Sequence, residues 1–429
     1  MTEGKSLDLD GTVMELVVSD DLSRKKQLAR RILEVARGEG VYPCSINEFY
    51  MARGRGRFDG FTVPAINLRS MTYDLARSIF RVAKRNNSGA FIFEIARSEI
   101  GYTGQSPVEY SGVVLAAALK ESYSGPVFVQ GDHFQVNATK FKENPDQEME
   151  GLKALITDAV GSGFYNIDID SSTLVDLSQR DVEKQQLPNC EVCARLTQFI
   201  RGIEPEGVTV SVGGEIGEIG HQNSTPEDLH GFMAGLKERL PKGLVGISKI
   251  SVQTGTTHGG VVLPDGSVAQ VNLDFNTLKT LSEIARREYG LAGAVQHGAS
   301  TLPPEAFHKF VECGTAEVHL ATEFQNMIYE SKHFPDELKK KMYQWLKINA
   351  ANEAKQGETE EQFLYKTRKK ALGPFKKEIM SLPQKTRDAI AAEIENKFEF
   401  LFKQLNAVNK SDLVKKYARS SSASQISSI

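Results

Sequence analysis

Short apolar runs alternate with amphipathic segments between residues 61 and 330. The runs are rich in Val, Ile, Phe and Ala, which predicts buried strands, and the segments between them have apolar residues at helical spacing. The predicted strands span residues 61–67, 90–96, 126–132, 165–170, 208–214, 246–255, 292–298 and 316–322. This alternation favours parallel pairing, and eight units over about 260 residues fit a (β/α)8 barrel. A doubly wound open sheet is the alternative, but no G-x-G-x-x-G follows the first strand.

The pattern outside this region divides the chain further. Residues 1–60 are predicted to form a partly helical segment, in which "DDLSRKKQLARRILEVARGEG" has an Asp cap and a glycine stop. Residues 61–330 make up the predicted barrel. Residues 331–418 are lysine-rich and lack strand runs, so we expect an α-helical extension there. Residues 419–429, "RSSSASQISSI", form a low-complexity tail that we expect to be disordered.

Composition and charge argue against a nucleic-acid-binding protein, a membrane protein and a disulfide-rich secreted protein. The net charge of −3 gives no reason to expect a nucleic-acid partner, and no apolar run approaches the roughly 20 residues of a membrane span. The N-terminus lacks the order of a signal peptide, so we expect a cytoplasmic protein. Four cysteines in 429 residues are no disulfide framework. Cys190 and Cys193 form a single C-x-x-C, which is better explained by small residues opening a helix than by redox chemistry.

Polar side chains gather where the predicted strands end. The carboxyl ends of barrel strands share one mouth, which is where (β/α)8 enzymes have their active sites. The residues at or just beyond these ends are Asn67, Asp132, His133, Asp168, Asp170, Glu215, His258, His297 and Thr322. The sequence therefore predicts a polar site at the barrel mouth.

Three of the eight histidines belong to this set, namely His133, His258 and His297. Each alone is better explained as a satisfied structural histidine, but three imidazoles at one mouth suit Zn²⁺ with an open fourth position. Two of them precede glycines, Gly259 and Gly298, which let the backbone approach a ligand closely.

Hydroxyl and acidic side chains complete the predicted site. Backbone amides grouped with Ser300 and Thr322 suit a phosphate. Asp132 precedes a proposed ligand and is placed to hold a substrate hydroxyl or move its proton. Glu215 lies in the glycine-flanked "VGGEIGEIG" and is a candidate exchangeable metal ligand. For Asp168 and Asp170, turn or helix capping and a role in the site are equally good interpretations.

These motifs together resemble the class II, metal-dependent fructose-bisphosphate aldolases and their tagatose-bisphosphate relatives. The motifs occur in the family's order over about residues 60 to 330, as "VPAIN", "GDH", "NIDIDSSTL", "GGEIGEIG", "GTTHGG", "VQHGAS" and "VHLATE". The resemblance implies a dimeric or tetrameric (β/α)8 enzyme of carbohydrate metabolism that uses Zn²⁺ or another divalent metal. The implied reaction is cleavage of a phosphorylated sugar, fructose 1,6-bisphosphate, to dihydroxyacetone phosphate and glyceraldehyde 3-phosphate, as in glycolysis.

The resemblance also assigns roles to residues. It makes His133, His258 and His297 metal ligands, Glu215 an alternate ligand and catalytic residue, and Asp132 the group that handles the C4 hydroxyl proton. The residues that it places against substrate or phosphate are Asn67, Gly259, Gly298, Ser300, His319 and Thr322. It further implies a monovalent cation, Na⁺ or K⁺, near the phosphate.

The sequence departs from the family at several positions. His319 replaces an asparagine, Ala321 is typical of tagatose-type members, and Ala299 replaces a glycine. Asn223 occupies the place of a catalytic acid in the loop after Glu215. Glu218, His221 and Glu227 are candidate substitutes for that acid. Two alternatives therefore stay open: a tagatose-bisphosphate aldolase or sugar epimerase on the same metal scaffold, and a non-catalytic aldolase accessory subunit.

Overall fold

Eight parallel strands close into a barrel in the computed structural model, which describes residues 7–217, 222–255 and 273–418. Each strand pairs with the next, and the last returns to the first, with Val63 opposite Glu317. The strands are β2 (Val63–Asn67), β3 (Ile92–Ala96), β4 (Gly125–Gln135), β5 (Asn166–Asp170), β6 (Ser211–Gly217), β7 (Lys249–Val252), β8 (Ala294–Gln296) and β9 (Glu317–Leu320). The predicted (β/α)8 barrel is confirmed.

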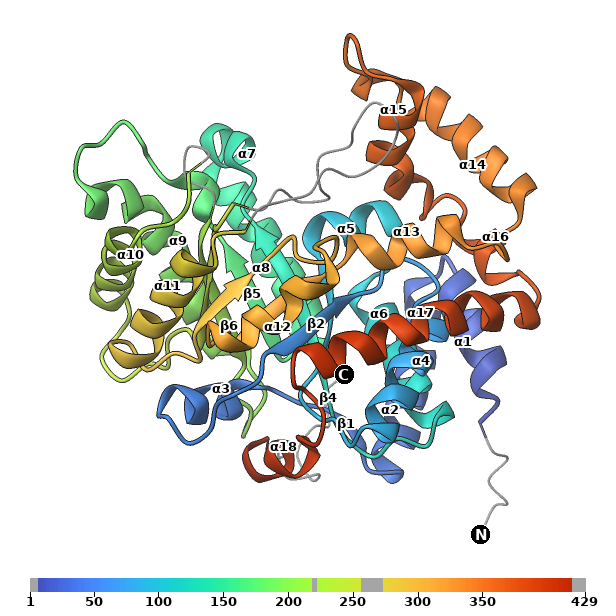
Figure 1. The fold of residues 1–429 in the computed structure, drawn as a ribbon, viewed down its shortest axis with the longest axis horizontal. Helices are drawn as coiled ribbons and strands as arrows, with labels where there is room; N and C mark the ends of the chain where they lie inside the picture. The colour runs from blue at the N-terminus through green and yellow to red at the C-terminus, as the bar shows by residue number, and fades with distance from the viewer. Residues whose placement is uncertain (1–6, 218–221, 256–272, 419–429) are drawn as a thin grey trace.

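Helices surround the barrel and connect its strands (Figure 1). They are α4 (Thr72–Arg85), α5 (Arg97–Thr103), α6 (Pro107–Lys120), α7 (Ala138–Glu143), α8 (Pro145–Gly161), α9 (Val182–Ile203), α10 (Pro226–Arg239), α11 (Phe275–Arg287) and α12 (Phe307–Glu312). Their N-termini follow local sequence rules. The Asn144 side chain accepts from the Gln147 amide, with Pro145 at the first position of α8. Thr225 and Asp228 form a capping box on α10.

The N-terminal segment is built from α1 (Leu9–Val18), α2 (Leu22–Gly38), β1 (Val41–Pro43) and α3 (Asn47–Gly54). The predicted cap of α2 is present, because the Asp21 carboxylate accepts from the amides of Ser23 and Arg24. Strand β1 was not predicted. Its three residues are too short to show an alternating pattern, and it pairs in parallel with the start of β4, Val41 opposite Gly125.

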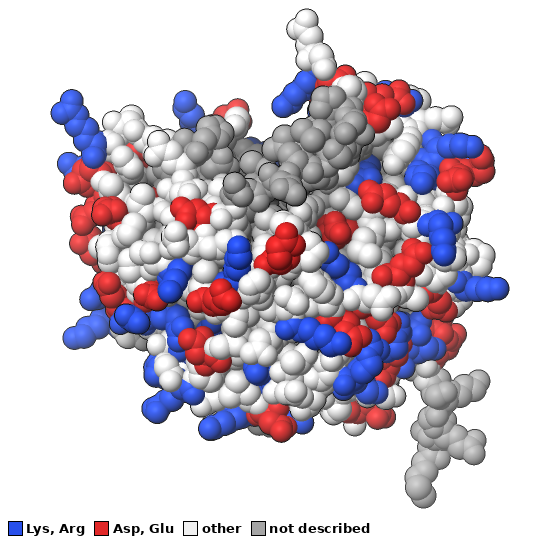
Figure 2. All heavy atoms as spheres, in the orientation of Figure 1, with Lys and Arg blue, Asp and Glu red and all other residues white. Residues whose placement is uncertain are grey.

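The C-terminal part of the chain consists of helices. They are α13 (Thr322–Glu330), α14 (Asp336–Asn349), α15 (Glu360–Thr367), α16 (Lys376–Met380), α17 (Gln384–Gln404) and α18 (Ser411–Tyr417). Helix α17 lies along α4 (Figure 1), and its Phe398 ring is 4.9 Å from the ring of Phe324 in α13. Figure 2 shows blue and red side chains mixed over the visible face. Between α4 and α17, Arg81 and Arg85 pair with Glu395.

All four cysteines are buried, and none of them forms a disulfide. Cys190 and Cys193 lie in the middle of α9 rather than at its start, so this detail of the prediction is wrong. Burial raises the pKa of each of these two thiols to about 12. At neutral pH they therefore stay protonated and act as small core residues.

None of the helices in the described part of the chain combines the length and the apolar character that a membrane span requires.

Candidate active site

A β-bulge in β4 positions the first two site residues. Gly131 pairs with Ile167 and Phe134 with Ile169, so β4 has one residue more than β5 between these pairs. His133 has a φ of 39°, in the left-handed region. Gly131 makes room for the bulge, because a Cβ there would lie 2.5 Å from the Phe134 ring.

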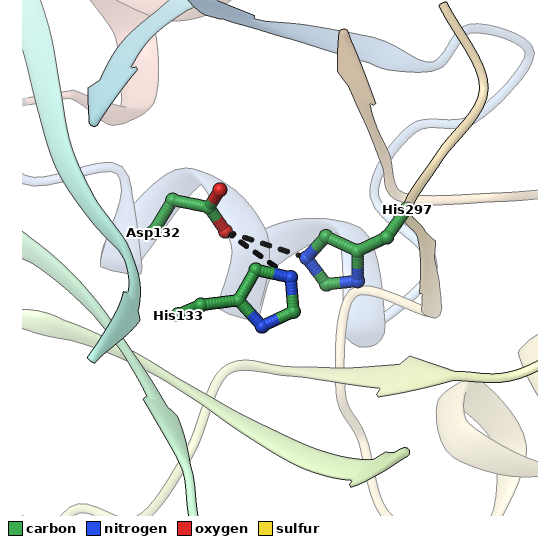
Figure 3. A group of neighbouring side chains, drawn as sticks. All are labelled: Asp132, His133 and His297. Atoms are coloured by element: carbon green, nitrogen blue, oxygen red, sulfur yellow. Dashed lines mark ion pairs between the residues drawn. The ribbon is translucent and has the colours of Figure 1, made fainter. Parts of the chain in front are cut away.

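Asp132, His133 and His297 come together at the mouth (Figure 3). Asp132 Oδ1 lies 3.4 Å from His297 Nε2 and 3.8 Å from His133 Nε2, and the two imidazole rings are 4.0 Å apart. One potential ligand atom from each residue lies within 4.8 Å of the other two. Two imidazole nitrogens beside a carboxylate are donors that suit Zn²⁺. The third predicted histidine, His258, and its neighbour Gly259 lie outside the described residues.

Carboxylates flank the other side of His133. Its Nδ1 is 3.0 Å from Glu215 Oε2 and 3.2 Å from Asp170 Oδ2. Burial would lower the pKa of His133, but Glu215 and Asp132 outweigh it and raise that pKa well above its usual value. Burial, with the charge of Asp170 adding to it, raises the pKa of Glu215 to about 7. This concentration of negative charge favours a bound cation at the mouth.

Asp170 lies beside the site and also forms the capping contacts that the sequence left open. Besides contacting His133, it accepts hydrogen bonds from the amide and hydroxyl of Ser172, at 3.2 and 2.7 Å. It therefore caps the turn after β5 and borders the site.

Of the predicted substrate- and phosphate-binding residues, Gly298, Ser300, His319 and Thr322 line a cavity of about 560 Å³ at the mouth, which Asp132, His133 and His297 also line. Asn67 does not line it. Gly298 has a φ of 67°, which favours glycine. The Ser300 hydroxyl accepts from the Glu323 amide at 3.3 Å, and Thr322 is the first residue of α13. Gly298, Ser300 and Thr322 thus come together as predicted.

Two cations that line this cavity were missed by sequence reasoning. Arg69 Nη1 donates to Thr322 Oγ1 at 3.4 Å, and Arg69 also pairs with Glu99 at 2.7 Å. Lys369, from the C-terminal segment, lines the same cavity. Asn67 lies at the end of β2 as predicted, and its amide donates to Glu99. Arg69 lies two residues beyond Asn67, so the strand-end rule that marked Asn67 could have found it. No sequence pattern marked Lys369, because its place depends on how the C-terminal segment packs.

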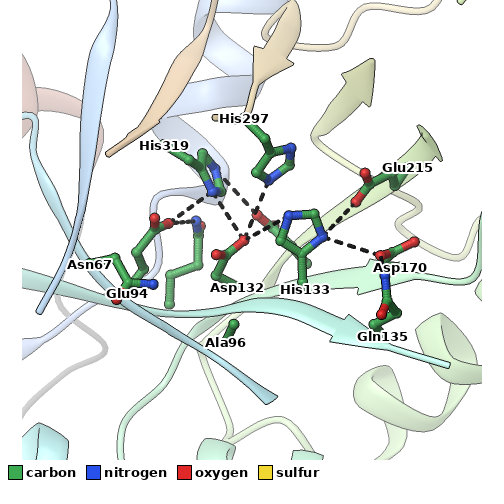
Figure 4. A network of polar contacts seen from close by, with 12 residues as sticks. Asn67, Glu94, Ala96, Asp132, His133, Gln135, Asp170, Glu215, His297 and His319 are labelled. Carbon is green, nitrogen blue, oxygen red and sulfur yellow. Dashed lines mark hydrogen bonds and ion pairs between the residues drawn. The ribbon is translucent and has the colours of Figure 1, made fainter. Parts of the chain in front are cut away.

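His319 contacts Asp132 and is surrounded by acidic side chains (Figure 4). Its Nδ1 is 3.0 Å from both Asp132 Oδ1 and Glu94 Oε2, and its Nε2 is 2.6 Å from Glu317 Oε1. The sequence analysis named His319 as a substrate-binding residue, but it did not name Glu94 or Glu317. Both glutamates could have been found, because each is a charged residue within an otherwise apolar strand, where barrels usually have apolar side chains.

Lys249 compensates part of this buried negative charge. Its ammonium is 2.9 Å from Asp168 Oδ2 and 2.5 Å from Glu317 Oε1. Burial raises the pKa of Asp168 to about 6. For Glu317, Lys249 and His319 outweigh burial and lower the pKa. Burial chiefly, with Asp132 and Glu317 adding to it, raises the pKa of Glu94 well above its usual value.

Comparison with known proteins places the chain in a family. The family model described as fructose-bisphosphate aldolase class-II matches residues 55–405. None of the curated proteins compared matches the chain. A solved fructose-bisphosphate aldolase from Campylobacter jejuni is 20% identical, covers 86% of this chain and 97% of its own, and has a TM-score of 0.48.

Two further solved structures share the fold. One is described as a probable tagatose 6 phosphate kinase from Sinorhizobium meliloti 1021, with 16% identity, coverage of 81% of this chain and 97% of its own, and a TM-score of 0.55. The other is the fructuronate-tagaturonate epimerase UxaE from Cohnella laeviribosi, with 12% identity, coverage of 91% and 85%, and a TM-score of 0.53. Since the family match spans most of the 429 residues, the chain belongs to the class II fructose-bisphosphate aldolase family.

Proposed function

We propose that the protein cleaves a ketose bisphosphate reversibly, with fructose 1,6-bisphosphate as the first candidate and dihydroxyacetone phosphate and glyceraldehyde 3-phosphate as the products. The observation that carries this proposal is the group of Asp132, His133 and His297 in the cavity that Ser300 and Thr322 also line. His133 and His297 would hold a divalent ion, Zn²⁺ first, together with His258 and with Glu215 as the exchangeable ligand. When bound, this ion supplies Lewis-acid polarisation of the ketose carbonyl.

Asp132 is the proposed base. The ion pairs of Asp132 with His133, His297 and His319 use Oδ1. We assign to Oδ2 the role of taking the proton of the substrate C4 hydroxyl. The C3–C4 bond then breaks, C4 leaves as an aldehyde, and the electron pair stays on the three-carbon ketose fragment. That fragment takes a proton at C3, and the reverse sequence makes the bond.

His133 and Asp132 have charges that suit this role. Burial would raise the pKa of Asp132, but His133 and His319 outweigh it and hold that pKa well below its usual value. The carboxylate is therefore ionised and can accept a proton at neutral pH. The Asp132 carboxylate stays ionised only while positive charge lies beside it, either on protonated histidines or on a bound metal.

The phosphate is proposed to bind at the wall made by Gly298, Ser300 and Thr322, with the positive charges of Arg69 and Lys369 beside it. Together they provide a backbone turn, two hydroxyl groups and two positive charges, and such groups can bind the oxygens of a phosphate. A Na⁺ or K⁺ ion at this phosphate remains part of the proposal.

An epimerase on the same scaffold is the second candidate. Asn223, at the position of the expected acid, donates from its amide to Asp274 at 3.3 Å, so its side chain is engaged there and has no proton to transfer. Glu227 lies exposed in the first turn of α10, and Glu218 and His221 are outside the described residues. An enzyme that removes a C–H proton beside the carbonyl and returns it to the opposite face of the same carbon would give a six-carbon epimer, and the Cohnella laeviribosi neighbour is named as an epimerase.

Product analysis separates these candidates. The metal-loaded protein would be incubated with fructose 1,6-bisphosphate and with tagatose 1,6-bisphosphate, and the products identified by mass and by enzyme-coupled triose assays. Triose phosphates support the aldolase. A six-carbon isomer without trioses would overturn cleavage in favour of epimerisation. A protein that binds no metal and forms neither product would contradict both and favour an accessory subunit.

A further inference from the structure

His319 is held between carboxylates on both edges of its ring. On one edge, Nε2 lies 2.6 Å from Glu317 Oε1, and on the other, Nδ1 lies 3.0 Å from Asp132 Oδ1. The residue is only 4% exposed. Since an ionised carboxylate has no hydrogen to give, a ring nitrogen that contacts one must donate. The geometry therefore requires ring protons toward both Glu317 and Asp132.

Glu317, on the side of His319 away from Asp132, is held in place inside the barrel. Glu317 Oε1 also accepts from Lys249 Nζ at 2.5 Å and from Gln130 Nε2 at 2.8 Å, and Tyr50 donates to its second oxygen. Lys249 and Glu317 are 1% and 0% exposed. Because these donors come from strands β4 and β7 and from helix α3, Glu317 cannot turn without breaking contacts to several elements.

Glu94 limits the ring from the side. Its Oε2 is 3.0 Å from His319 Nδ1 and accepts from Gln130 Nε2 at 3.2 Å. Gln130 thus donates a hydrogen bond to both Glu94 and Glu317. Figure 4 shows His319 and His297 directed at Asp132 from different sides. The orientation of the imidazole is thereby determined before any ligand enters the cavity.

We propose that His319 is a positioning residue: clamped by Glu317 and Lys249, it holds Oδ1 of Asp132 so that Oδ2 faces the substrate. The inference rests on the proposed function for the role of Asp132 as base. A carboxylate gripped at one oxygen has a defined orientation for the other, which favours proton transfer in a reactive geometry. The relay Lys249–Glu317–His319–Asp132 runs from the barrel interior to the mouth.

Steady-state kinetics with the zinc-loaded protein test this role. Compared with wild type, His319→Ala should lower kcat about 10- to 100-fold, the range for groups that orient a reacting residue, with KM and zinc content kept. His319→Asn retains one N–H donor and should recover part of the lost kcat. Glu317→Gln keeps its shape but loses its charge and should lower kcat in the same direction. The matched control is His308→Asn, a half-exposed histidine of α12, which should change nothing.

A purely structural role predicts a different pattern. If His319→Ala and His319→Asn lose activity equally, or if KM or zinc content changes while kcat does not, the positioning role is overturned. Thermal unfolding shows whether each variant is folded. If His319→Ala does not fold, the kcat of Glu317→Gln tests the same inference.

A second measurement does not depend on turnover. NMR of zinc-loaded protein with ¹⁵N-labelled histidine should show two slowly exchanging ring N–H protons that disappear in His319→Asn and shift in Asp132→Asn. A single ring proton, or no shift on changing Asp132, overturns the inference. If these signals are present but no ketose bisphosphate is cleaved, the proposed function fails while the clamp on Asp132 stands.

Discussion

Asp132 and His133 are consecutive residues of one strand, yet both side chains face the barrel mouth, with 3.8 Å between Asp132 Oδ1 and His133 Nε2. In a regular strand, consecutive side chains point to opposite faces. The bulge between Gly131 and Phe134 removes this alternation, at the expense of a left-handed backbone at His133. A proposed base and a proposed metal ligand thus share one site because of a local irregularity.

The bulge can be tested through Gly131. Gly131→Ala places a Cβ 2.5 Å from the Phe134 ring, so the strand or the ring must shift. We expect a loss of stability of about 1–3 kcal/mol, as for other overpacked cores, together with less bound zinc. Urea unfolding and metal analysis measure the two effects. Gly151→Ala, where a Cβ meets nothing within 4 Å, is the control. Unchanged zinc binding and stability in Gly131→Ala would show that the bulge does not set the site.

Removing a proposed ligand should reduce metal binding and activity together. His297→Ala deletes an imidazole that is 94% buried beside Asp132 and His133, as its exposed fraction of 6% shows. We expect at least about tenfold weaker zinc binding, since even changes to groups behind a ligand cost about 10- to 100-fold. Competition with a chromophoric chelator gives the affinity. A variant that binds zinc as tightly as wild type would remove His297 from the ligand set.

Replacing the proposed base should separate metal binding from catalysis. Asp132→Asn keeps the size of the side chain but cannot accept the hydroxyl proton. We expect kcat to fall about 10²- to 10⁴-fold, the usual range for general acid–base groups, with zinc content unchanged. Metal analysis and cleavage assays on the same preparation measure both quantities. Near-wild-type kcat would mean that another group takes the proton.

Acid should weaken the attachment of α17 to α4. Burial would raise the pKa of Glu395, but hydrogen bonds from Arg81 and Arg85 outweigh it and lower that pKa below 4.5. A lowered folded-state pKa gives stability that is present above 4.5 and lost as pH falls through the folded value. Glu395→Gln should therefore cost about 1 kcal/mol near neutral pH, and the difference from wild type should shrink in acid.

Urea unfolding at neutral and acidic pH measures this difference. Glu393→Gln, on the same helix and 3.6 Å from His333, serves as the control and should cost less. A difference between wild type and Glu395→Gln that stays constant as the pH falls would show that these ion pairs do not couple the helix to pH.

The barrel was predictable because its strands are local and periodic. Runs such as "AFIFEIA" and "AEVHLAT" are apolar, short and bounded by helices, so their pattern reports burial directly. Strand β1 and the docking of α17 were not predictable in this way. Both depend on pairing with distant segments, β4 and α4 respectively, which no local pattern reports.

The candidate site likewise has residues that the sequence predicted and residues that it did not. Asp132, His133, Glu215 and His297 were found from their places at strand ends, where barrel topology forces convergence. The clamp on His319 was not found, because it depends on side chains that point inward from several strands. The division of the chain into domains stays a prediction, and the predicted disordered tail lies outside the described residues.

Metal-dependent cleavage is the central claim, and one assay tests it most directly. The purified protein would be treated with EDTA, dialysed, and assayed with fructose 1,6-bisphosphate before and after Zn²⁺ is added back, with zinc counted per chain. We expect triose phosphate formation to be lost on chelation and restored with Zn²⁺ in proportion to bound metal. Cleavage that is unaffected by complete removal of metal, or zinc-loaded protein that forms no triose, would contradict it.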